Sequence, residues 1–321
     1  MYNVISCGAI NWDINLFVSH LPKEGEEVRV LRIERVPGGT AANVIVAAAR
    51  YLGPGKTAII GAVGDDEIGR KQIEILKKEG VSTEYVLIIN GVESGQAYIL
   101  IDKDGANVIN TFFGANTYLS TKYIASISKV FRESKVKVVM DPPLDVAIKI
   151  LELGYGFGIN IWDPGVYIEY GIKALAKGIR YTDILILNHI EVKELFGTLQ
   201  LTSLVNRLRE LECSKLLIKY GSKGSQLINI DENTIVNMST LPLDKISLKV
   251  VNTVGCGDAF IGVFGAALSE DKSLIDAMLL ATIAAGYKAS RRETRGSPSR
   301  DVLIGLHNRC KEYINIQIKN I

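Results

Sequence analysis

Short apolar runs that alternate with helical stretches are the feature that most limits how this chain can fold. Several runs are apolar almost throughout, as strands covered on both faces must be. The predicted strands are Val4–Gly8, Thr57–Val63, Val136–Met140, Gly158–Trp162, Ile184–Leu187 and Leu216–Lys219. The helices predicted between them are Glu67–Glu79, Leu144–Leu153, Ile168–Arg180 and Glu191–Glu212. This alternation predicts an α/β protein with a doubly wound, mainly parallel sheet.

Two regions early in the chain depart from the alternation. Glu27–Val36 mixes charged with β-branched residues, while Gln96–Ile101 and Asn107–Phe113 flank Asp-Lys-Asp-Gly, a good hairpin turn. These stretches predict antiparallel strands outside the main sheet. We expect them to form a small β-sheet lid from segments of about 14–37 and 92–114.

Composition and charge argue against several classes of protein. The chain has 321 residues, of which 47% are hydrophobic, and its formal net charge is only +2. It can therefore bury a large core, and its charge does not favour nucleic acid as a partner. The four cysteines and three histidines are scattered, without zinc or disulfide spacing. No apolar run reaches the roughly 18 residues of a membrane helix. We expect a cytoplasmic protein that binds neither membrane nor nucleic acid.

The strongest chemical signal is a glycine-rich turn that leads into an apolar helix. In the run from Asn252 to Phe260, Gly255 and Gly257 directly precede the predicted helix. Backbone N–H groups and the helix dipole at such a turn form an anion hole, which suits a phosphoryl group in transfer. Asp258, in the first turn, is placed to accept a proton from an attacking hydroxyl. The plainer alternative is a simple turn followed by an acidic residue that only complements the dipole.

A second glycine pair, Gly38 and Gly39, precedes another predicted helix. Paired glycines let a ligand approach the backbone closely, and Asn43 in the first helical turn offers a donor and acceptors to a polyol. The alternative is a tight turn in which Thr40 caps the helix.

Polar residues and a glycine recur at the ends of successive predicted strands. These positions are Asp141, Asp163, Asn188 and Gly221. Ligands of open α/β sheets bind beyond the carboxyl ends of the strands, so the recurrence suggests a site, although turn propensity alone also explains each Asp or Asn.

Together, the two glycine-rich segments resemble the signature regions of the ribokinase-like (PfkB) family of carbohydrate and nucleoside kinases. Further motifs in the same order extend the resemblance over nearly the whole chain: Asn11 with Asp13, GAN at 114–116, Asn188 with Glu191, KYGSKG at 219–224 and RGSPS at 295–299. The resemblance implies one ribokinase-like domain over residues 1–321 with a β lid. It also implies transfer of the γ-phosphoryl group of ATP to a primary hydroxyl of a nucleoside or sugar, with Mg²⁺.

The resemblance also assigns roles to individual residues. The implied catalytic residues are Asp258, as general base, and the anion-hole residues Gly255, Cys256 and Gly257. The implied substrate-binding residues are Asn11, Asp13, Gly38, Gly39, Asn43, Phe113, Asn116 and Asp258. The implied ATP-binding residues are Asn188, Lys219, Gly221, Ser222, Gly224, Gly255, Gly257 and Gly296. Glu191 is expected to act on Mg²⁺ through water.

One residue departs from the family pattern. The second signature usually begins with Asp-Thr, and the Asp helps to hold a monovalent cation that organises the anion hole; here the pair is Asn252-Thr253. Asparagine keeps an oxygen ligand but loses the charge, so a cation site at Asn252 is expected to be weak.

The acceptor is the least determined part of the prediction. Phe112 and Phe113, next to the GAN motif, can stack on a nucleobase, and together with Trp162–Gly165 they resemble archaeal-type nucleoside kinases. The alternatives are aromatic residues that only pack the lid, and a sugar kinase of the ribokinase, fructokinase or 2-keto-3-deoxygluconate kinase type. More remote alternatives are a non-catalytic binding protein and a nicotinamide-dependent oxidoreductase. The oxidoreductase would need a glycine fingerprint after the first strand, and this sequence has none there.

Two further expectations concern the surface. Apolar residues on the predicted lid strands favour a homodimer that forms through the lid, because the edges of a small sheet invite pairing. The basic cluster Lys288, Arg291, Arg292 and Arg295 is expected to form a solvated face, and contact with a nucleotide phosphate is the alternative.

Overall fold

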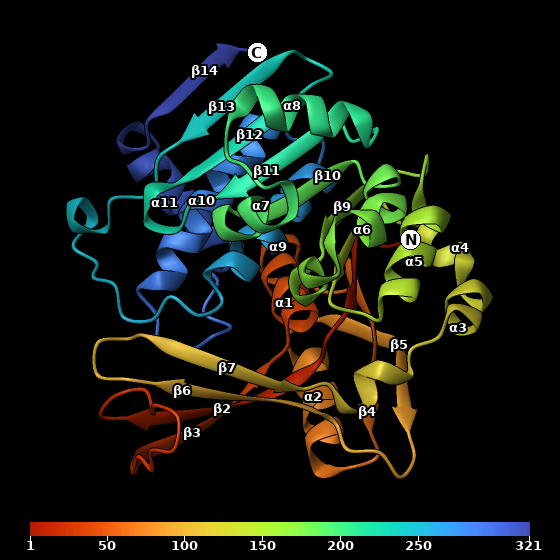
Figure 1. Ribbon diagram of the computed structural model, residues 1–321, viewed down its shortest axis with the longest axis vertical. Helices are drawn as coiled ribbons and strands as arrows, with labels where there is room; N and C mark the ends of the chain where they lie inside the picture. Colours follow the sequence, from red (N-terminus) through yellow and green to blue (C-terminus); the bar gives the residue numbers. More distant parts are fainter.

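A large mixed sheet forms the centre of the computed structural model, which describes residues 1–321 (Figure 1). It has ten strands in the order β14-β13-β12-β11-β10-β9-β8-β1-β4-β5. The parallel strands are β1 (Val4–Gly8), β4 (Thr57–Gly64), β5 (Val81–Ile89), β8 (Val136–Met140), β9 (Ile159–Asp163), β10 (Ile184–Asn188) and β11 (Lys215–Lys219). Antiparallel strands β12 (Ser225–Asn229), β13 (Thr234–Met238) and β14 (Ile316–Asn320) extend one edge. The predicted fold class is confirmed.

Helices cover both faces of this sheet. One face carries α1 (Thr40–Leu52), α2 (Glu67–Lys78), α9 (Cys256–Ser269), α10 (Leu274–Ala289) and α11 (Arg300–Cys310). The other carries α3 (Thr121–Ser126), α4 (Ser128–Glu133), α5 (Leu144–Gly154), α6 (Gly171–Arg180), α7 (His189–Phe196) and α8 (Leu201–Glu210). None of these helices is both long and apolar enough to cross a membrane.

Successive side chains of the parallel strands feed two separate cores. Val4 and Ile186 belong to the hydrophobic cluster beneath α1 and α9, whereas Ile5 and Leu187 belong to the cluster beneath α5 to α8. Because neighbouring side chains of a strand point to opposite faces, both faces of the sheet must be apolar, and the strands read as continuous apolar runs.

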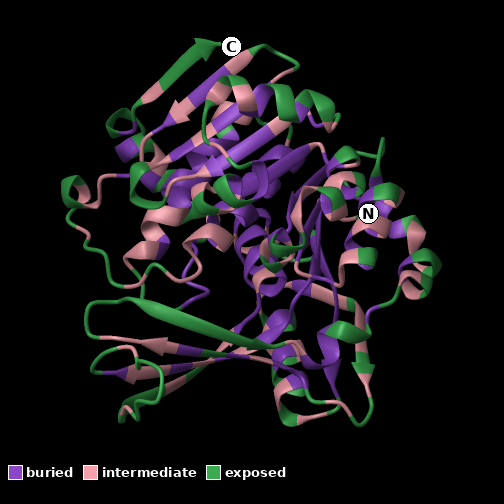
Figure 2. Cartoon of the chain, in the orientation of Figure 1, coloured by how far each residue is buried: buried purple, intermediate pink, exposed green.

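A second, four-stranded sheet stands apart from the main one, below it in Figure 1. Its order is β3 (Val30–Gly38), β2 (Asn11–Val18), β6 (Gly95–Ile101) and β7 (Asn107–Phe112). Strand β7 is exposed along its whole length (Figure 2). The sheet includes most of the predicted lid segments 14–37 and 92–114, and its action as a lid stays a prediction.

Several predicted elements need correction. The single helix over Glu191–Glu212 is wrong, because Gly197 adopts the left-handed conformation (φ 73°) and ends α7, so that α8 starts only at Leu201. Strands β2, β5 and β14 were not predicted, whereas β12 and β13 form the hairpin that the sequence predicts over Gln226–Ile230 and Thr234–Met238. Strand β5 lies at the edge of the sheet and is only partly buried, so its sequence lacks the continuous apolar run of a central strand.

Candidate active site

The two predicted signature segments meet because helices α1 and α9 pack very closely. Gly262 of α9 makes this possible, since a Cβ there would lie 2.3 Å from the carbonyl oxygen of Val44 in α1. The contact brings the first turns of the two helices together, and Asn43 Nδ2 donates a hydrogen bond to Asp258 Oδ2 at 2.8 Å. The predicted substrate ligand and the predicted base are therefore neighbours.

Asp258 has the electrostatics of a usable base. Loss of solvent raises the pKa of Asp258 to about 6, while the hydrogen bond from Asn43 and the charge of Lys219 lower it. The carboxylate is therefore mostly ionised at pH 7. Only Oδ2 receives a hydrogen bond from another side chain, so Oδ1 is left to accept a proton.

The turn before Asp258 has the backbone geometry of an anion hole. Gly255 adopts φ 82°, and a Cβ there would lie 2.4 Å from the carbonyl oxygen of Thr294, so only glycine fits. The N–H of Cys256 donates to Thr253 O at 3.2 Å and is not free. The N–H groups of Gly257 and Asp258, in the first turn of α9, have no backbone acceptor. These two groups are the donors that the turn presents.

Lys219 lies over this turn and is held by a carboxylate. Its Nζ donates to Asp163 Oδ2 at 2.7 Å and would lie 3.8 Å from a Cβ at Gly257. Burial alone would lower the pKa of Lys219, but the charge and hydrogen bond of Asp163 raise it. A charged ammonium group therefore faces the turn at Gly257.

Asn188 and Glu191 form a capping box at the start of α7. The Asn188 side chain accepts from the N–H groups of Ile190 and Glu191, and Glu191 Oε2 accepts from the N–H of Asn188 at 2.7 Å. Burial and the charge of Asp163 raise the pKa of Glu191 to about 7. No three His, Cys, Asp or Glu side chains are arranged to hold a metal ion. A magnesium ion here would take most of its ligands from water and nucleotide phosphates, as it commonly does.

The predicted sugar ligands lie where β1 passes into β2. Asp13 is 5% exposed, and a Cβ on Gly38 would lie 2.0 Å from its carboxylate, which explains the need for glycine. Burial raises the pKa of Asp13 to about 7, although the charge of Arg295 lowers it. Asn116 holds the side chain of Asn11 at the start of β2, because its amide donates to Asn11 Oδ1 at 2.8 Å.

The other residues predicted to bind the substrate are less directly placed. Gly39, with φ 90°, allows α1 to begin beside Asn11, because a Cβ there would lie 2.5 Å from the Asn11 nitrogen. Phe113 follows the end of β7 with helical dihedral angles, so strand alternation does not decide which way its ring points. Its carbonyl oxygen accepts from Asn116 at 2.8 Å.

Arg295 is a residue that the sequence misplaced. It was expected on a solvated basic face, yet it is 7% exposed. Its guanidinium donates to Asn43 Oδ1 at 2.9 Å, to Gly38 O at 2.8 Å and to Gln72 Oε1 at 3.2 Å. Of the cluster, only Arg291 and Arg292 are exposed. Although the 295–299 loop resembles a family motif, nothing local to the sequence shows that the Arg295 side chain is buried against the start of α1.

Lys288 is the second buried member of that cluster and contacts Asn252. Its Nζ donates to Asn252 O at 2.8 Å. The Asn252 side chain is also engaged, since Oδ1 accepts from Val254 N at 2.9 Å and Nδ2 donates to Arg292 O at 2.8 Å. The monovalent cation implied by the family resemblance does not fit this arrangement, because the Lys288 ammonium group already lies on the Asn252 carbonyl oxygen and the neutral amide offers no charge to offset a second cation.

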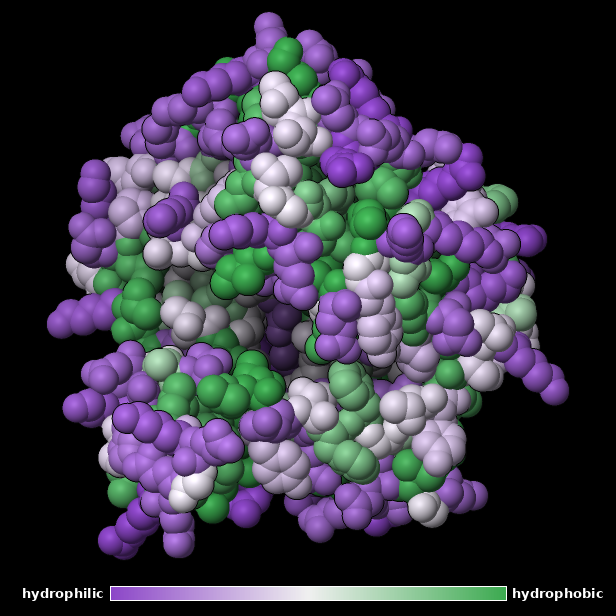
Figure 3. Space-filling model, viewed as in Figure 1, coloured by the Kyte–Doolittle hydropathy of each residue, from purple (hydrophilic) through white to green (hydrophobic).

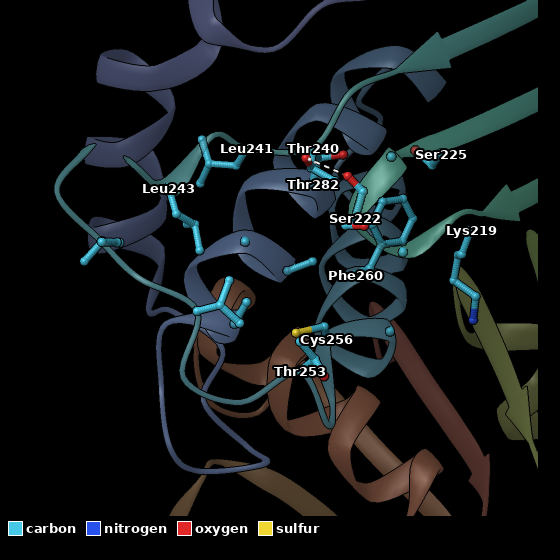
Figure 4. Close-up of a pocket in the computed structure, with 18 of the residues that line it drawn as sticks. Lys219, Ser222, Ser225, Thr240, Leu241, Leu243, Thr253, Cys256, Phe260 and Thr282 are labelled. Atoms are coloured by element: carbon cyan, nitrogen blue, oxygen red, sulfur yellow. Dashed lines mark hydrogen bonds between the residues drawn. The ribbon is translucent and has the colours of Figure 1, made fainter. Parts of the chain in front are cut away.

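A cavity of about 840 Å³ opens beside the anion hole (Figure 4). Of the residues predicted to bind ATP or form the anion hole, those lining it are Asn188, Lys219, Gly221, Ser222, Gly224, Cys256 and Gly257. Apolar side chains that the sequence did not single out form much of the remaining wall: Leu241, Leu243, Leu248, Val250, Phe260, Ala285 and Ala289. Gly255 and Gly296 do not line it. The surface is hollowed between the small sheet and the main body (Figure 3).

Comparison with known proteins gives a consistent result. The family model for pfkB family carbohydrate kinase matches residues 1–300. A ribokinase of Dictyostelium discoideum is 28% identical over 314 residues, covering 92% of this chain and 96% of the relative. The ribokinase structure from Thermotoga maritima superposes with a TM-score of 0.83 at 27% identity, covering 96% of this chain and 100% of that one. The Arabidopsis thaliana ribokinase complexed with ribose and ATP gives 0.82 at 26%, covering 95% and 99%.

Proposed function

The chain belongs to the pfkB family of carbohydrate kinases, and on this premise we propose that it transfers the γ-phosphoryl group of ATP to a primary hydroxyl of a nucleoside or sugar, with Asp258 as general base. The observation that carries this proposal is the position of Asp258 beside two unpaired N–H groups at the start of α9 and opposite the Lys219 ammonium. A base, an anion hole and a cation at one point are the parts that phosphoryl transfer needs.

In the proposed reaction, the acceptor hydroxyl lies between Asp258 and the γ-phosphoryl group. Asp258 Oδ1 takes the proton as the new O–P bond forms, and the bond from the γ-phosphorus to the bridging oxygen breaks. The N–H groups of Gly257 and Asp258, together with Lys219, stabilise the charge on the transferring group. Mg²⁺, when bound, would neutralise phosphate charge, and Asn188 and Glu191 would act on it through water.

We assign the nucleotide to the cavity of about 840 Å³. The loop of Gly221, Ser222 and Gly224 is proposed to contact its phosphates and ribose. The apolar side chains of that wall, such as Leu241 and Val250, suit the faces of an adenine ring. Gly296 would act only indirectly, by shaping the neighbouring loop.

For the acceptor we favour a nucleoside over a free sugar, on the evidence of the small sheet. Asp13 and Asn15 are only 5% and 8% exposed and project from the same face of β2, yet neither side chain forms a hydrogen bond within the protein. Nearly buried polar groups without partners indicate ligand contacts. Two positions along a strand span roughly 6.6 Å, more than the spacing of neighbouring ring hydroxyls.

The neighbours of Asn15 support the same choice. Ala97 and Ile99 of β6 pair with Asp13 and Asn15, are nearly buried, and belong to neither main core. A small apolar floor next to an amide suits a flat ring with a polar edge, which describes a nucleobase. Phe113, whose ring direction strand alternation does not decide, is kept as a further proposed contact of the acceptor.

Outside the active site, we propose a homodimer that forms through the small sheet. Its outer face carries exposed apolar side chains, among them Ile33, Tyr98 and Phe112. Such a face on a sheet with a fully exposed edge strand favours pairing with a second copy. We also propose a cytoplasmic setting. All four cysteines are unpaired, which supports this proposal.

An ATP-consumption assay with nucleosides and free sugars, ribose included, tests the proposed function. Asp258→Asn should keep its fold and lower kcat on the order of 10²–10⁴-fold. Asp301→Asn is the matched control, because Asp301 also lies in the first turn of a helix but away from the site. Turnover by Asp258→Asn close to that of the control would refute the role of the base.

The choice of acceptor has its own test. Asn15→Ala should raise KM for nucleosides roughly five- to tenfold, the effect of one lost hydrogen bond, and leave KM for ribose unchanged. Asn107→Ala, which removes an exposed amide from β7 of the same sheet, is the control. A free sugar preferred tenfold over every nucleoside would remove the nucleoside assignment and leave the kinase assignment standing.

A further inference from the structure

Lys288 carries a fully buried positive charge for which the fold has no carboxylate partner. The residue lies in the last turn of α10 and is 0% exposed. It forms no ion pair, and its one recorded hydrogen bond is the 2.8 Å contact to the carbonyl oxygen of Asn252. A buried ammonium group without a counter-ion costs several kcal/mol, so its presence beside the site requires an explanation.

The position of the Lys288 charge relative to the anion hole explains why it is there. Asn252 begins the turn that ends in Gly255, and the N–H groups of Val251 and Asn252 both donate to Ala289 O, at 2.7 and 3.1 Å. Lys288 therefore ties the end of α10 to the start of the turn. Burial lowers the pKa of Lys288, while Cys256, Asp258 and Glu293 raise it and favour the charged form; two of these three groups belong to the first turn of α9.

The contacts of Asn252 fix the orientation of the same peptide from the other side. Its side-chain oxygen accepts from Val254 N, and its amide donates to Arg292 O. The Asn252 carbonyl is held by Lys288, and in this arrangement of the turn the N–H groups of Gly257 and Asp258 are unpaired.

We infer that the Lys288 ammonium group is a built-in cation behind the anion hole, which orients the turn and supplies the positive charge that a bound monovalent cation would otherwise provide. Lys288 is thus a positioning residue that acts through the Asn252 peptide and does not touch the substrate. This inference goes beyond the proposed kinase function, and its kinetic part rests on that function. It also accounts for the neutral side chain at position 252, since a second fixed cation would not fit beside Lys288.

The first test compares cations on the wild-type protein. At equal ionic strength, kcat in potassium chloride and in tetramethylammonium chloride should agree within about twofold. The melting temperature should likewise not differ between the two salts. Strong, saturable activation or stabilisation by potassium would overturn the inference, whatever the variants do.

The second test removes the charge. Lys288→Met should lower kcat roughly ten- to hundredfold, the usual effect of losing a group that orients an active site from behind, with a smaller change in KM. Lys288→Ala, which leaves a cavity, should gain both activity and melting temperature from potassium or methylammonium in a saturable way. Lys137→Met is the matched control, since Lys137 is also buried and also donates to a backbone carbonyl, that of Phe157, on a different part of the sheet.

The control should lose stability without any cation-specific change in kcat. A folded Lys288→Met enzyme with wild-type kcat, or a Lys288→Ala protein indifferent to potassium and methylammonium, would refute the inference. Failure of the proposed function would look different: the wild type would phosphorylate no acceptor, while the cation dependence of the melting temperatures would still be measurable.

Discussion

Replacing Arg295 by methionine should destabilise the protein by about 3 kcal/mol. The side chain is nearly as long but offers no donors, so the three acceptors on Asn43, Gly38 and Gln72 lose their partner in a buried place. Each unsatisfied buried acceptor costs roughly 1–3 kcal/mol. The lower end applies, because removing a buried cation also removes its own desolvation penalty.

The same substitution should change acceptor binding in a characteristic way. The charge of Arg295 lowers the pKa of Asp13, which burial raises to about 7, so its removal raises that pKa further. Less of the Asp13 carboxylate is then ionised at pH 7. KM for the acceptor should therefore increase at neutral pH and recover toward the wild-type value as the pH rises. The Asn43 amide, no longer fixed by Arg295, should add a loss in kcat.

Urea denaturation and the pH dependence of KM measure the two effects. Arg309→Met, on the last turn of α11, is the control for removing an arginine outside the site. The reasoning is refuted if Arg295→Met unfolds within about 0.5 kcal/mol of the control and its KM follows the same pH curve as the wild type. Arg295→Lys keeps the charge but loses the planar fork, so its free energy of unfolding and its KM should lie between those of the wild type and of Arg295→Met.

Three further predictions follow from the site and the small sheet. Because Asp258 must be ionised and its pKa is raised to about 6, kcat should fall about tenfold per pH unit well below pH 6; a flat profile down to pH 5 would contradict the assignment. Gly255→Ala places a Cβ 2.4 Å from Thr294 O at a positive φ, so thermal denaturation should show a loss of more than about 1 kcal/mol, whereas Gly305→Ala, where nothing lies within 4 Å, should not be destabilised. Light scattering should find a dimer at micromolar concentration that Phe112→Asp dissociates; a wild-type monomer would exclude dimerisation through the small sheet.

The fold could be predicted to a large extent because its signals are local. Apolar strands such as Ile184–Leu187 mark a sheet covered on both faces, and a glycine pair before a helix marks a ligand-binding turn whether or not the rest is known. Strand β5 was not predicted because an edge strand does not need a continuous apolar run. The break at Gly197 was not predicted because a single glycine within a helical pattern is often tolerated.

The surroundings of the site could not be predicted in the same way. Whether Arg295 and Lys288 meet water or a backbone carbonyl depends on how the loop after α10 folds against α1 and the turn at Asn252, and these segments are far apart in sequence. Local composition makes a run of basic residues look solvated. The burial of Arg295 and Lys288 results from tertiary packing, which local composition does not show.

The close contact of Gly262 with α1 has a consequence for how the protein can change over evolution. The pair Asn43 and Asp258 is carried by two helices locked together at their backbones, whereas Asn15, Ala97 and Ile99 stand on strands of the separate small sheet. Mutations on the inner face of that sheet can therefore exchange one acceptor for another without disturbing the alignment of the base. Directed evolution for a new acceptor would do best to randomise those strands and leave the two helices intact.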